Sequence, residues 1–189
     1  MSFVLWITGL PCSGKTTLSK NIKSRLNNQN MTIVTLDGDD MRETISSDLD
    51  YSYMSRKENV RRVAYIAKLL SAQGISSIVS ILSPLEKHRT EAAKIIGEKF
   101  HLIYLDTSLS VCEKRDVKGM YKKARENKIK DFTGINSKFE KPSTYNLKIN
   151  TSNDSIGEST DVIIQYMEKE SLIRQNEFNN KKYFQKIKK

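Results

Sequence analysis

The sequence predicts an α/β fold with a central parallel sheet of about five strands, and three observations support this. Strand-like and helix-like segments alternate along most of the chain, as they do when helices connect parallel strands. A glycine-rich loop joins the first strand to the first helix, at the place where such sheets bind ligands. The chain has 189 residues, no internal repeat and no linker, so we expect one domain with a substantial core.

The elements are expected in a regular order. Residues 3–8 are apolar and predict a buried first strand, and Leu18, Ile22 and Leu26 recur at helical spacing within a helix over residues 15–27. Further strands are predicted over residues 32–36, 75–82, 101–106 and 147–150. Further helices are predicted over residues 56–72, 85–97, 109–115, 118–127 and 156–167.

The charge balance is basic, with 32 Lys and Arg against 22 Asp and Glu, a net charge of +10. This balance favours anionic partners. Half of the excess comes from five lysines within residues 178–189, which contain no acidic residue. A nucleic acid or an acidic surface would suit this tail, but we expect a solvated basic extension over residues 171–189, following a domain over residues 1–170.

Cysteine content and hydropathy indicate a cytoplasmic protein. Cys12 and Cys112 have no metal-ligand spacing, and we expect both to be reduced thiols. The N-terminus lacks the pattern of a signal peptide, and no apolar run approaches the roughly eighteen residues of a membrane span. We therefore expect neither secretion, a membrane partner nor a nucleic-acid partner.

The loop between the first strand and first helix fits G-x-x-x-x-G-K-[ST] from Gly9 to Thr16. The glycines permit a tight turn close to an anion, and the N–H groups of the loop and the following helix face the phosphates. Lys15 adds a positive charge, and the Thr16 hydroxyl suits a magnesium ion. Because a strand and a helix flank the motif correctly, it predicts a three-layer P-loop NTPase fold of the nucleotide-kinase type, which binds ATP and Mg²⁺. The expected ATP-binding residues of the loop are Gly9, Leu10, Pro11, Cys12, Ser13, Gly14, Lys15, Thr16 and Thr17.

Polar side chains also follow the second and third predicted strands. Asp37 and Asp39 flank a glycine, and ligands of parallel sheets lie beyond the carboxyl ends of the strands. One carboxylate suits a magnesium ion, together with Thr16, and the other suits orienting or deprotonating an attacking hydroxyl. A solvated Asp-Gly turn is the alternative. Ser83 before Pro84 fits a helix N-cap as well as a catalytic role.

Other polar positions are less specific. Residues 120–125 concentrate cations between the fourth and fifth strands and suit a mobile lid over phosphates, although such runs are usually solvated helix faces. Asp106, before Thr107 and Ser108, resembles a magnesium ligand but is better explained by a turn and cap. His88 and His101 have no partners at ligand spacing, so we expect structural or surface roles.

Together these residues resemble the adenylylsulfate kinase family over residues 3–167. The matching segments are the phosphate loop, Leu36-Asp37-Gly38-Asp39-Asp40-Met41-Arg42, Tyr51-Ser52, Arg56-Lys57-Glu58-Asn59-Val60-Arg61-Arg62, Ser80-Ile81-Leu82-Ser83-Pro84 with Arg89, Arg115-Asp116-Val117-Lys118-Gly119-Met120-Tyr121-Lys122-Lys123-Ala124-Arg125 and Lys130-Asp131-Phe132-Thr133-Gly134-Ile135. The phosphate loop is generic. The Tyr-Lys-Lys-Ala-Arg and Phe-Thr-Gly-Ile segments are highly specific.

The resemblance implies ATP-dependent phosphorylation of the ribose 3′-hydroxyl of adenosine 5′-phosphosulfate, which yields 3′-phosphoadenosine 5′-phosphosulfate. It implies that Asp39 receives or orients the hydroxyl proton and that Tyr51 and Phe132 sandwich the acceptor base. The other implied acceptor-binding residues are Arg42, Arg56, Asn59, Ile81, Leu82, Ser83 and Lys130, and Arg115 joins the ATP-binding set. The implied catalytic set is Lys15, Asp39, Ser83, Lys122 and Arg125. The family is often described with a phosphoserine at the position of Ser83, but in-line transfer needs no such intermediate, and we expect a pocket residue there.

The departures from the family pattern lie mainly on the acceptor side. Asp40 replaces the usual Asn, Asp50 and Tyr51 replace Gly and Phe, Ser55 replaces Asp, Val117 replaces Pro, and residues 136–145 are altered. A related kinase acting on another nucleotide-linked ribose is therefore the alternative, notably a cytidine diphosphoramidate kinase of capsule biosynthesis. A GTP-dependent switch is disfavoured because Asn127-Lys128-Ile129-Lys130 lacks the aspartate of Asn-Lys-x-Asp. We expect a homodimer that acts on a nucleotide acceptor.

Overall fold

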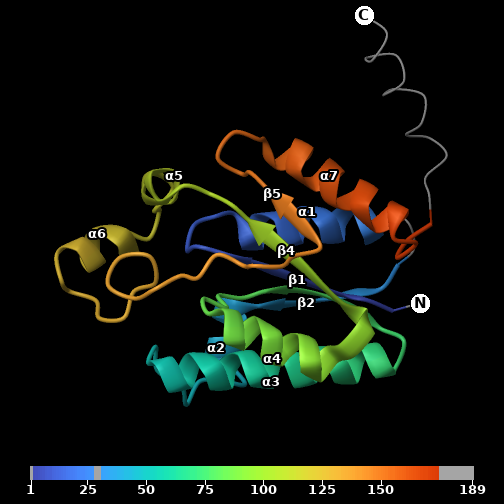
Figure 1. The fold of residues 1–189 in the computed structure, drawn as a ribbon, viewed down its shortest axis with the longest axis horizontal. Coiled ribbons are helices and arrows are strands. Elements are labelled where there is room, and N and C mark those ends of the chain that lie inside the picture. The colour runs from blue at the N-terminus through green and yellow to red at the C-terminus, as the bar shows by residue number, and fades with distance from the viewer. Residues whose placement is uncertain (1, 28–30, 175–189) are drawn as a thin grey trace, which may run out of the picture.

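A computed structural model describes residues 2–27 and 31–174 of the chain. Five parallel strands form one sheet in the order β2-β3-β1-β4-β5 (Figure 1). The strands are β1 (Val4–Gly9), β2 (Ile33–Asp37), β3 (Ser76–Ser80), β4 (Phe100–Leu105) and β5 (Leu147–Ile149). The predicted α/β fold with a five-stranded parallel sheet is confirmed.

Helices cover both faces of the sheet, which gives three layers. In Figure 1, α1 (Lys15–Asn27) and α7 (Ile156–Lys169) lie on one face, and α2 (Gly38–Glu43), α3 (Tyr53–Ala72) and α4 (Glu86–Ile96) lie on the other. A short 3₁₀ helix, Gly97–Lys99, follows α4. The small helices α5 (Leu109–Lys114) and α6 (Met120–Arg125) lie beyond one end of the sheet.

The central strand β1 packs on both faces of the sheet. Leu5 and Ile7 belong to the core beneath α1 and α7, whereas Val4 and Trp6 belong to the core beneath α3 and α4. This alternation is expected when successive side chains of a strand point to opposite faces and helices cover both. Because β1 pairs with β3 on one side and β4 on the other, its carboxyl end lies in the middle of the sheet edge.

Helix α2 was not predicted, because no helix was expected between the second strand and residue 56. Asp37 is the N-cap of this helix, and its side chain accepts a hydrogen bond from the N–H of Asp39. None of the six residues of α2 is buried, so the helix has no apolar stripe that periodicity could reveal. The predicted start of α3 at residue 56 is also late, because Ser52 caps the helix through the N–H of Ser55.

The C-terminal end of the domain lies beyond α7. Leu172 and Ile173 still pack against the core, although the predicted domain boundary is at residue 170. The five lysines of the predicted basic extension fall within residues 175–189, outside the described residues. Within residues 2–27 and 31–174, no helix has the length and apolar character needed to cross a membrane.

Candidate active site

The phosphate loop lies between the carboxyl end of β1 and the start of α1. Gly14 has a φ of +99°, in the left-handed region that favours glycine. A Cβ atom on Gly9 would lie 2.7 Å from Ser13 Oγ and 3.0 Å from the carbonyl oxygen of Leu105, so this position leaves no room for a side chain. The Thr151 hydroxyl, beyond β5, donates to the Ser13 carbonyl at 2.9 Å and anchors the loop on its other side.

Lys15 lies across the loop. Its Nζ donates to the carbonyl oxygens of Gly9 and Leu10 at 3.0 and 2.7 Å. Burial lowers the pKa of this amine to about 8, and the carboxylates of Asp37 and Asp39 oppose that shift. The side chain therefore brings a cation into the loop and close to the two acidic residues.

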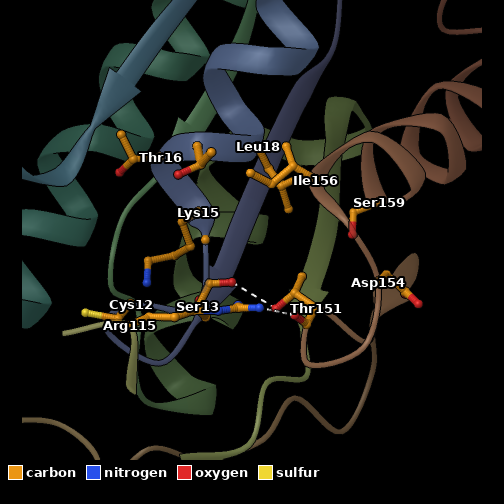
Figure 2. A pocket seen from close by; sticks show the side chains of 12 residues that line it. Cys12, Ser13, Lys15, Thr16, Leu18, Arg115, Thr151, Asp154, Ile156 and Ser159 are labelled. Carbon is orange, nitrogen blue, oxygen red and sulfur yellow. Dashed lines mark hydrogen bonds between the residues drawn. The ribbon is translucent and has the colours of Figure 1, made fainter. Parts of the chain in front are cut away.

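A pocket of about 350 Å³ opens beside the loop. Figure 2 shows the loop on one side of this pocket and Arg115, Thr151, Asp154, Ile156 and Ser159 around the rest. The Arg115 guanidinium donates to the Thr151 carbonyl at 2.7 Å, drawn as a dashed line in Figure 2. The structure thus brings Arg115 together with the phosphate loop, and the cavity has the size of a small-molecule site.

Asp37 connects the loop to the next two strands. Its Oδ2 accepts hydrogen bonds from Thr16 Oγ1 at 2.7 Å and from Ser80 Oγ at 2.8 Å, while Oδ1 accepts from the N–H of Asp39 at 3.0 Å. The two predicted metal ligands, Thr16 and Asp37, are therefore in direct contact. Among the described residues, no group of three or more His, Cys, Asp or Glu side chains is placed to hold a metal ion.

Asp39 lies one residue into α2 and pairs with a cation that the sequence did not single out. Its Oδ2 accepts a hydrogen bond from Lys118 Nζ at 2.7 Å. Lys118 belongs to the connection between α5 and α6, and it was one of several lysines in a basic stretch. No local signal distinguished it, because its partner is 79 residues away in the chain.

Arg42 and Arg56 enclose Tyr51. The guanidinium carbons of Arg42 and Arg56 lie 4.4 and 5.6 Å from the centre of the Tyr51 ring. Arg56 also donates from Nε to the Tyr51 carbonyl at 2.9 Å and from Nη2 to the Asp131 carbonyl at 2.5 Å. Arg56 therefore links the segment of Tyr51 to the residue that precedes Phe132.

Phe132 packs against α6, the helix that contains the predicted lid residues 120–125. Its ring meets the Tyr121 ring edge-on at 4.8 Å between centroids, and the Tyr121 hydroxyl donates to the Pro11 carbonyl in the phosphate loop at 2.9 Å. Asn59 lies in α3 with only 3% of its surface exposed, and its Oδ1 has no hydrogen-bond partner among the described residues. Lys130 is exposed.

Ser83 points into the core. Its Oγ accepts from Trp6 Nε1 at 3.1 Å and donates to Thr8 Oγ1 at 3.0 Å, and the residue is fully buried. The alternative of a helix N-cap is wrong, because α4 is capped at Leu85 without a side-chain bond. Ile81 is also buried, so these two side chains support the strand end and do not line open space.

The remaining predicted positions differ in their surroundings. Arg125 pairs with Glu113 of α5 at 2.7 Å, and Lys122 is exposed. Ser108 caps α5, as the predicted turn and cap after Asp106 required, and Asp106 accepts a hydrogen bond from the Tyr104 hydroxyl. His88 is buried, and burial lowers its pKa to about 4. Both cysteines are free thiols.

Comparison with known proteins adds independent findings. A family model described as adenylylsulphate kinase matches residues 1–150. The adenylyl-sulfate kinase of Clostridium acetobutylicum is 41% identical over 170 residues, covering 90% of this chain and 85% of that protein. That of Phocaeicola vulgatus is 44% identical over 163 residues, covering 86% and 80%. The solved structure of the Mycobacterium tuberculosis APS kinase CysC with AMPPNP and APS superimposes with a TM-score of 0.85 at 36% identity, covering 88% of this chain and 98% of that one.

Proposed function

The chain belongs to the adenylylsulphate kinase family, and from this we propose how its own residues perform the reaction. The protein is an ATP-dependent kinase that phosphorylates the ribose 3′-hydroxyl of adenosine 5′-phosphosulfate. The product is 3′-phosphoadenosine 5′-phosphosulfate. One observation carries the assignment of roles: Asp39 is bound through its N–H to Asp37, which accepts a hydrogen bond from Thr16 of the phosphate loop, and the Asp39 carboxylate is close enough to act on the charge of Arg42, which lies over the Tyr51 ring.

The donor half of the site is the phosphate loop with the pocket beside it. The N–H groups of residues 9–17 bind the phosphates of ATP, because the loop and the start of α1 direct them toward one anion. Lys15 leaves the carbonyls of Gly9 and Leu10 to contact the β- and γ-phosphates. Arg115 lies in the wall of the same pocket and contacts the nucleoside part of ATP.

Thr16 and Asp37 suit Mg²⁺ as a cofactor. A hydroxyl and a carboxylate in contact at 2.7 Å supply the hard oxygen donors that Mg²⁺ prefers. Mg²⁺ commonly uses one or two protein ligands together with phosphate oxygens and water, so a larger acidic cluster is not needed. When bound, the ion neutralises charge on the phosphates during transfer.

The acceptor half lies around Tyr51. Arg42 and Arg56 bind the anionic 5′ group of the acceptor, since guanidinium groups bind oxyanions through paired hydrogen bonds. Tyr51 and Phe132 enclose the acceptor base from two sides, and stacking of this kind contributes about 1–3 kcal/mol per base. The unpaired Oδ1 of Asn59 is available to accept a hydrogen bond from the acceptor. Lys130 and the backbone of residues 81–83 complete the pocket.

The chemical step is a direct in-line transfer. Asp39 orients the 3′-hydroxyl and receives its proton while the hydroxyl oxygen forms a bond to the γ-phosphorus and ADP departs. Lys15 and the lid cations, including Lys122 and Arg125, stabilise the charge on the transferring group. Ser83 supports the strand end through Trp6 and Thr8 and forms no phosphoserine, because its hydroxyl is enclosed in the core.

We also propose a homodimer. Met54, Tyr65 and Leu69 are large apolar residues with 67%, 48% and 68% of their surface exposed. Their spacing places them along one side of α3. An exposed apolar stripe of this kind is typical of a subunit interface. Light scattering of the purified chain measures the oligomeric state, and a monomer would contradict this proposal.

The test of function is a comparison of acceptors. ADP release from ATP is measured with adenosine 5′-phosphosulfate and, in parallel, with cytidine diphosphoramidate. We expect the higher kcat/KM with adenosine 5′-phosphosulfate; a clear preference for the cytidine compound would refute the choice of acceptor. Lys15→Ala should abolish turnover. Lys20→Ala, an exposed lysine of the same helix, serves as the matched control and should leave turnover unchanged.

A further inference from the structure

A second cavity, of about 480 Å³, lies beside the carboxyl end of β4. Its wall is formed by Leu10 at the start of the phosphate loop, by the end of β4, and by residues 134–139 of the connection between α6 and β5. Among the described residues, none lines both this cavity and the pocket assigned to ATP, and none of those assigned to the acceptor lines it. The cavity therefore has its own set of residues.

The cavity lies where a loop, rather than a helix, covers the end of β4. Tyr104 points to the same face of the sheet as Leu102, which belongs to the core beneath α3 and α4. The Tyr104 ring packs against the rings of Phe139 and Tyr145, at 6.3 and 6.2 Å between centroids. Both of these rings belong to the connection that runs back alongside β4 in Figure 1. The N–H of Asn146 attaches this connection to the Leu102 carbonyl at 2.9 Å.

The part of the connection that forms the cavity wall is held at both ends. At one end, the N–H of Gly134 donates to the Ser137 carbonyl at 2.8 Å. At the other end, Arg89 of α4, only 2% exposed, donates to the Glu140 carbonyl at 2.7 Å. The N–H of Glu86 donates to Glu140 Oε2 at 2.9 Å. The wall is thus fixed before any ligand arrives, as is usual for small-molecule sites.

The lining of the cavity is mainly apolar. Leu10, Leu109 and Ile135 provide aliphatic surface, and they also pack against the small core around α6. Tyr104 and Phe139 provide aromatic surface, with their ring planes 22° apart. A flat aromatic ligand gains free energy from contact with surfaces of both kinds.

The charges of the lining have one sign. Of the described residues that line the cavity, the charged ones are Lys138 and Lys141, whose side chains are 73% and 75% exposed. Their ion-pair partners, Glu140 at 3.0 Å and Asp106 at 3.4 Å, do not line the cavity. Exposed ion pairs contribute little to stability, so both ammonium groups are available to an anion. Charge complementarity therefore selects a negatively charged ligand.

We propose that this cavity is a second binding site, for a small aromatic anion: a flat ring system that carries a carboxylate, sulfonate or phosphate group. The ring system lies against Tyr104, Phe139 and the aliphatic wall. The negative group lies at the mouth, where Lys138 and Lys141 exchange their carboxylate partners for it. Because the two cavities share no described lining residue, this ligand and ATP bind together.

The test uses two fluorescent probes with the folded full chain. 8-Anilino-1-naphthalenesulfonate is an aromatic anion, and N-phenyl-1-naphthylamine is its uncharged counterpart. Lys138→Met/Lys141→Met removes the charges at the mouth, and Ser137→Phe fills the cavity. Lys20→Met/Lys94→Met is the matched control, because it removes as many charges from exposed lysines of α1 and α4. Titrations are made with and without saturating AMPPNP, and urea unfolding checks that each variant is folded.

We expect saturable binding of the sulfonate to a single site of wild type, unchanged by AMPPNP. In Lys138→Met/Lys141→Met its Kd should rise about tenfold, as for the loss of two exposed charge contacts, while the uncharged probe binds as before. The control should match wild type, and Ser137→Phe should bind neither probe. Absent binding to wild type, displacement by AMPPNP, an unchanged sulfonate Kd in Lys138→Met/Lys141→Met, or full binding to folded Ser137→Phe would each overturn the proposal. If Ser137→Phe does not fold, the lysine variants decide.

Discussion

Replacing Ser83 by alanine tests whether the hydroxyl of this residue has a structural role or a catalytic one. The hydroxyl accepts from Trp6 Nε1 at 3.1 Å and donates to Thr8 Oγ1 at 3.0 Å in a fully buried site. In the Ser83→Ala variant the indole N–H loses its acceptor. The Thr8 hydroxyl keeps the carbonyl oxygen of residue 83 as a weak partner at 3.4 Å. The main cost is therefore one unsatisfied buried donor.

An unsatisfied buried donor costs about 1–3 kcal/mol, so we expect the free energy of unfolding to fall by about 2 kcal/mol. For a chain of this size, that loss lowers Tm by about 4–8 °C. Activity should respond much less. Direct transfer uses no Ser83 hydroxyl, so kcat should fall by less than about tenfold.

Urea unfolding followed by fluorescence measures the stability change, because Trp6 is the single tryptophan of the chain and is fully buried. Ser77→Ala is the matched control. Ser77 is equally buried in β3, but its Oγ has no hydrogen-bond partner among the described residues, so its removal should cost nothing. Unchanged stability in Ser83→Ala together with a hundredfold loss of kcat would refute the structural role.

Three further predictions concern charge. Burial lowers the pKa of His88 to about 4, so the imidazole takes up a proton in the unfolded chain at a higher pH than in the folded protein. The free energy of unfolding should therefore fall by up to about 3 kcal/mol as pH falls from 6.5 to 4. Urea unfolding of His88→Phe should show a free energy of unfolding that depends less on pH. Arg56→Lys keeps the positive charge but loses the two guanidinium hydrogen bonds to the carbonyls of Tyr51 and Asp131. The KM for the acceptor should therefore rise about tenfold, while the Kd for AMPPNP stays unchanged. An unchanged KM would contradict this. Asp39→Asn should lower kcat at least about a hundredfold while calorimetry finds normal AMPPNP binding; near-normal kcat would exclude Asp39 from proton transfer.

Periodicity and loop chemistry made most of the fold predictable. The apolar run of β1 is buried on both faces, and such a continuous run is the clearest signal of a central parallel strand. The strand and helix around residues 9–16 then positioned the phosphate loop. By contrast, α2 was not recognised, because its six residues include none that is fully buried, and a short helix held by one Asp cap carries no helical pattern.

The geometry of the site was less predictable than its composition. Arg56 and Phe132 were recognisable from their motifs, but the bond from Arg56 to the Asp131 carbonyl joins residues 75 apart. Lys118 was hidden among neighbouring lysines for the same reason. Local sequence patterns indicate contacts between residues that are close along the chain. Contacts between the α5–α6 region and the sheet edge depend on the tertiary structure of the whole domain. The burial of Ser83 likewise depends on Trp6 from another strand.

The strand order has a consequence for how new specificities arise. Arg115 and Thr151, beside the ATP pocket, follow α5 and β5 on one flank of β1, whereas Arg42 and Tyr51 follow β2 on the other. The two halves share little more than the loop, Asp37 and Asp39. Substitutions that change the acceptor half of the site therefore leave the geometry of the ATP half unchanged. A domain with two such separate halves can change its phosphate acceptor while ATP remains the phosphate donor.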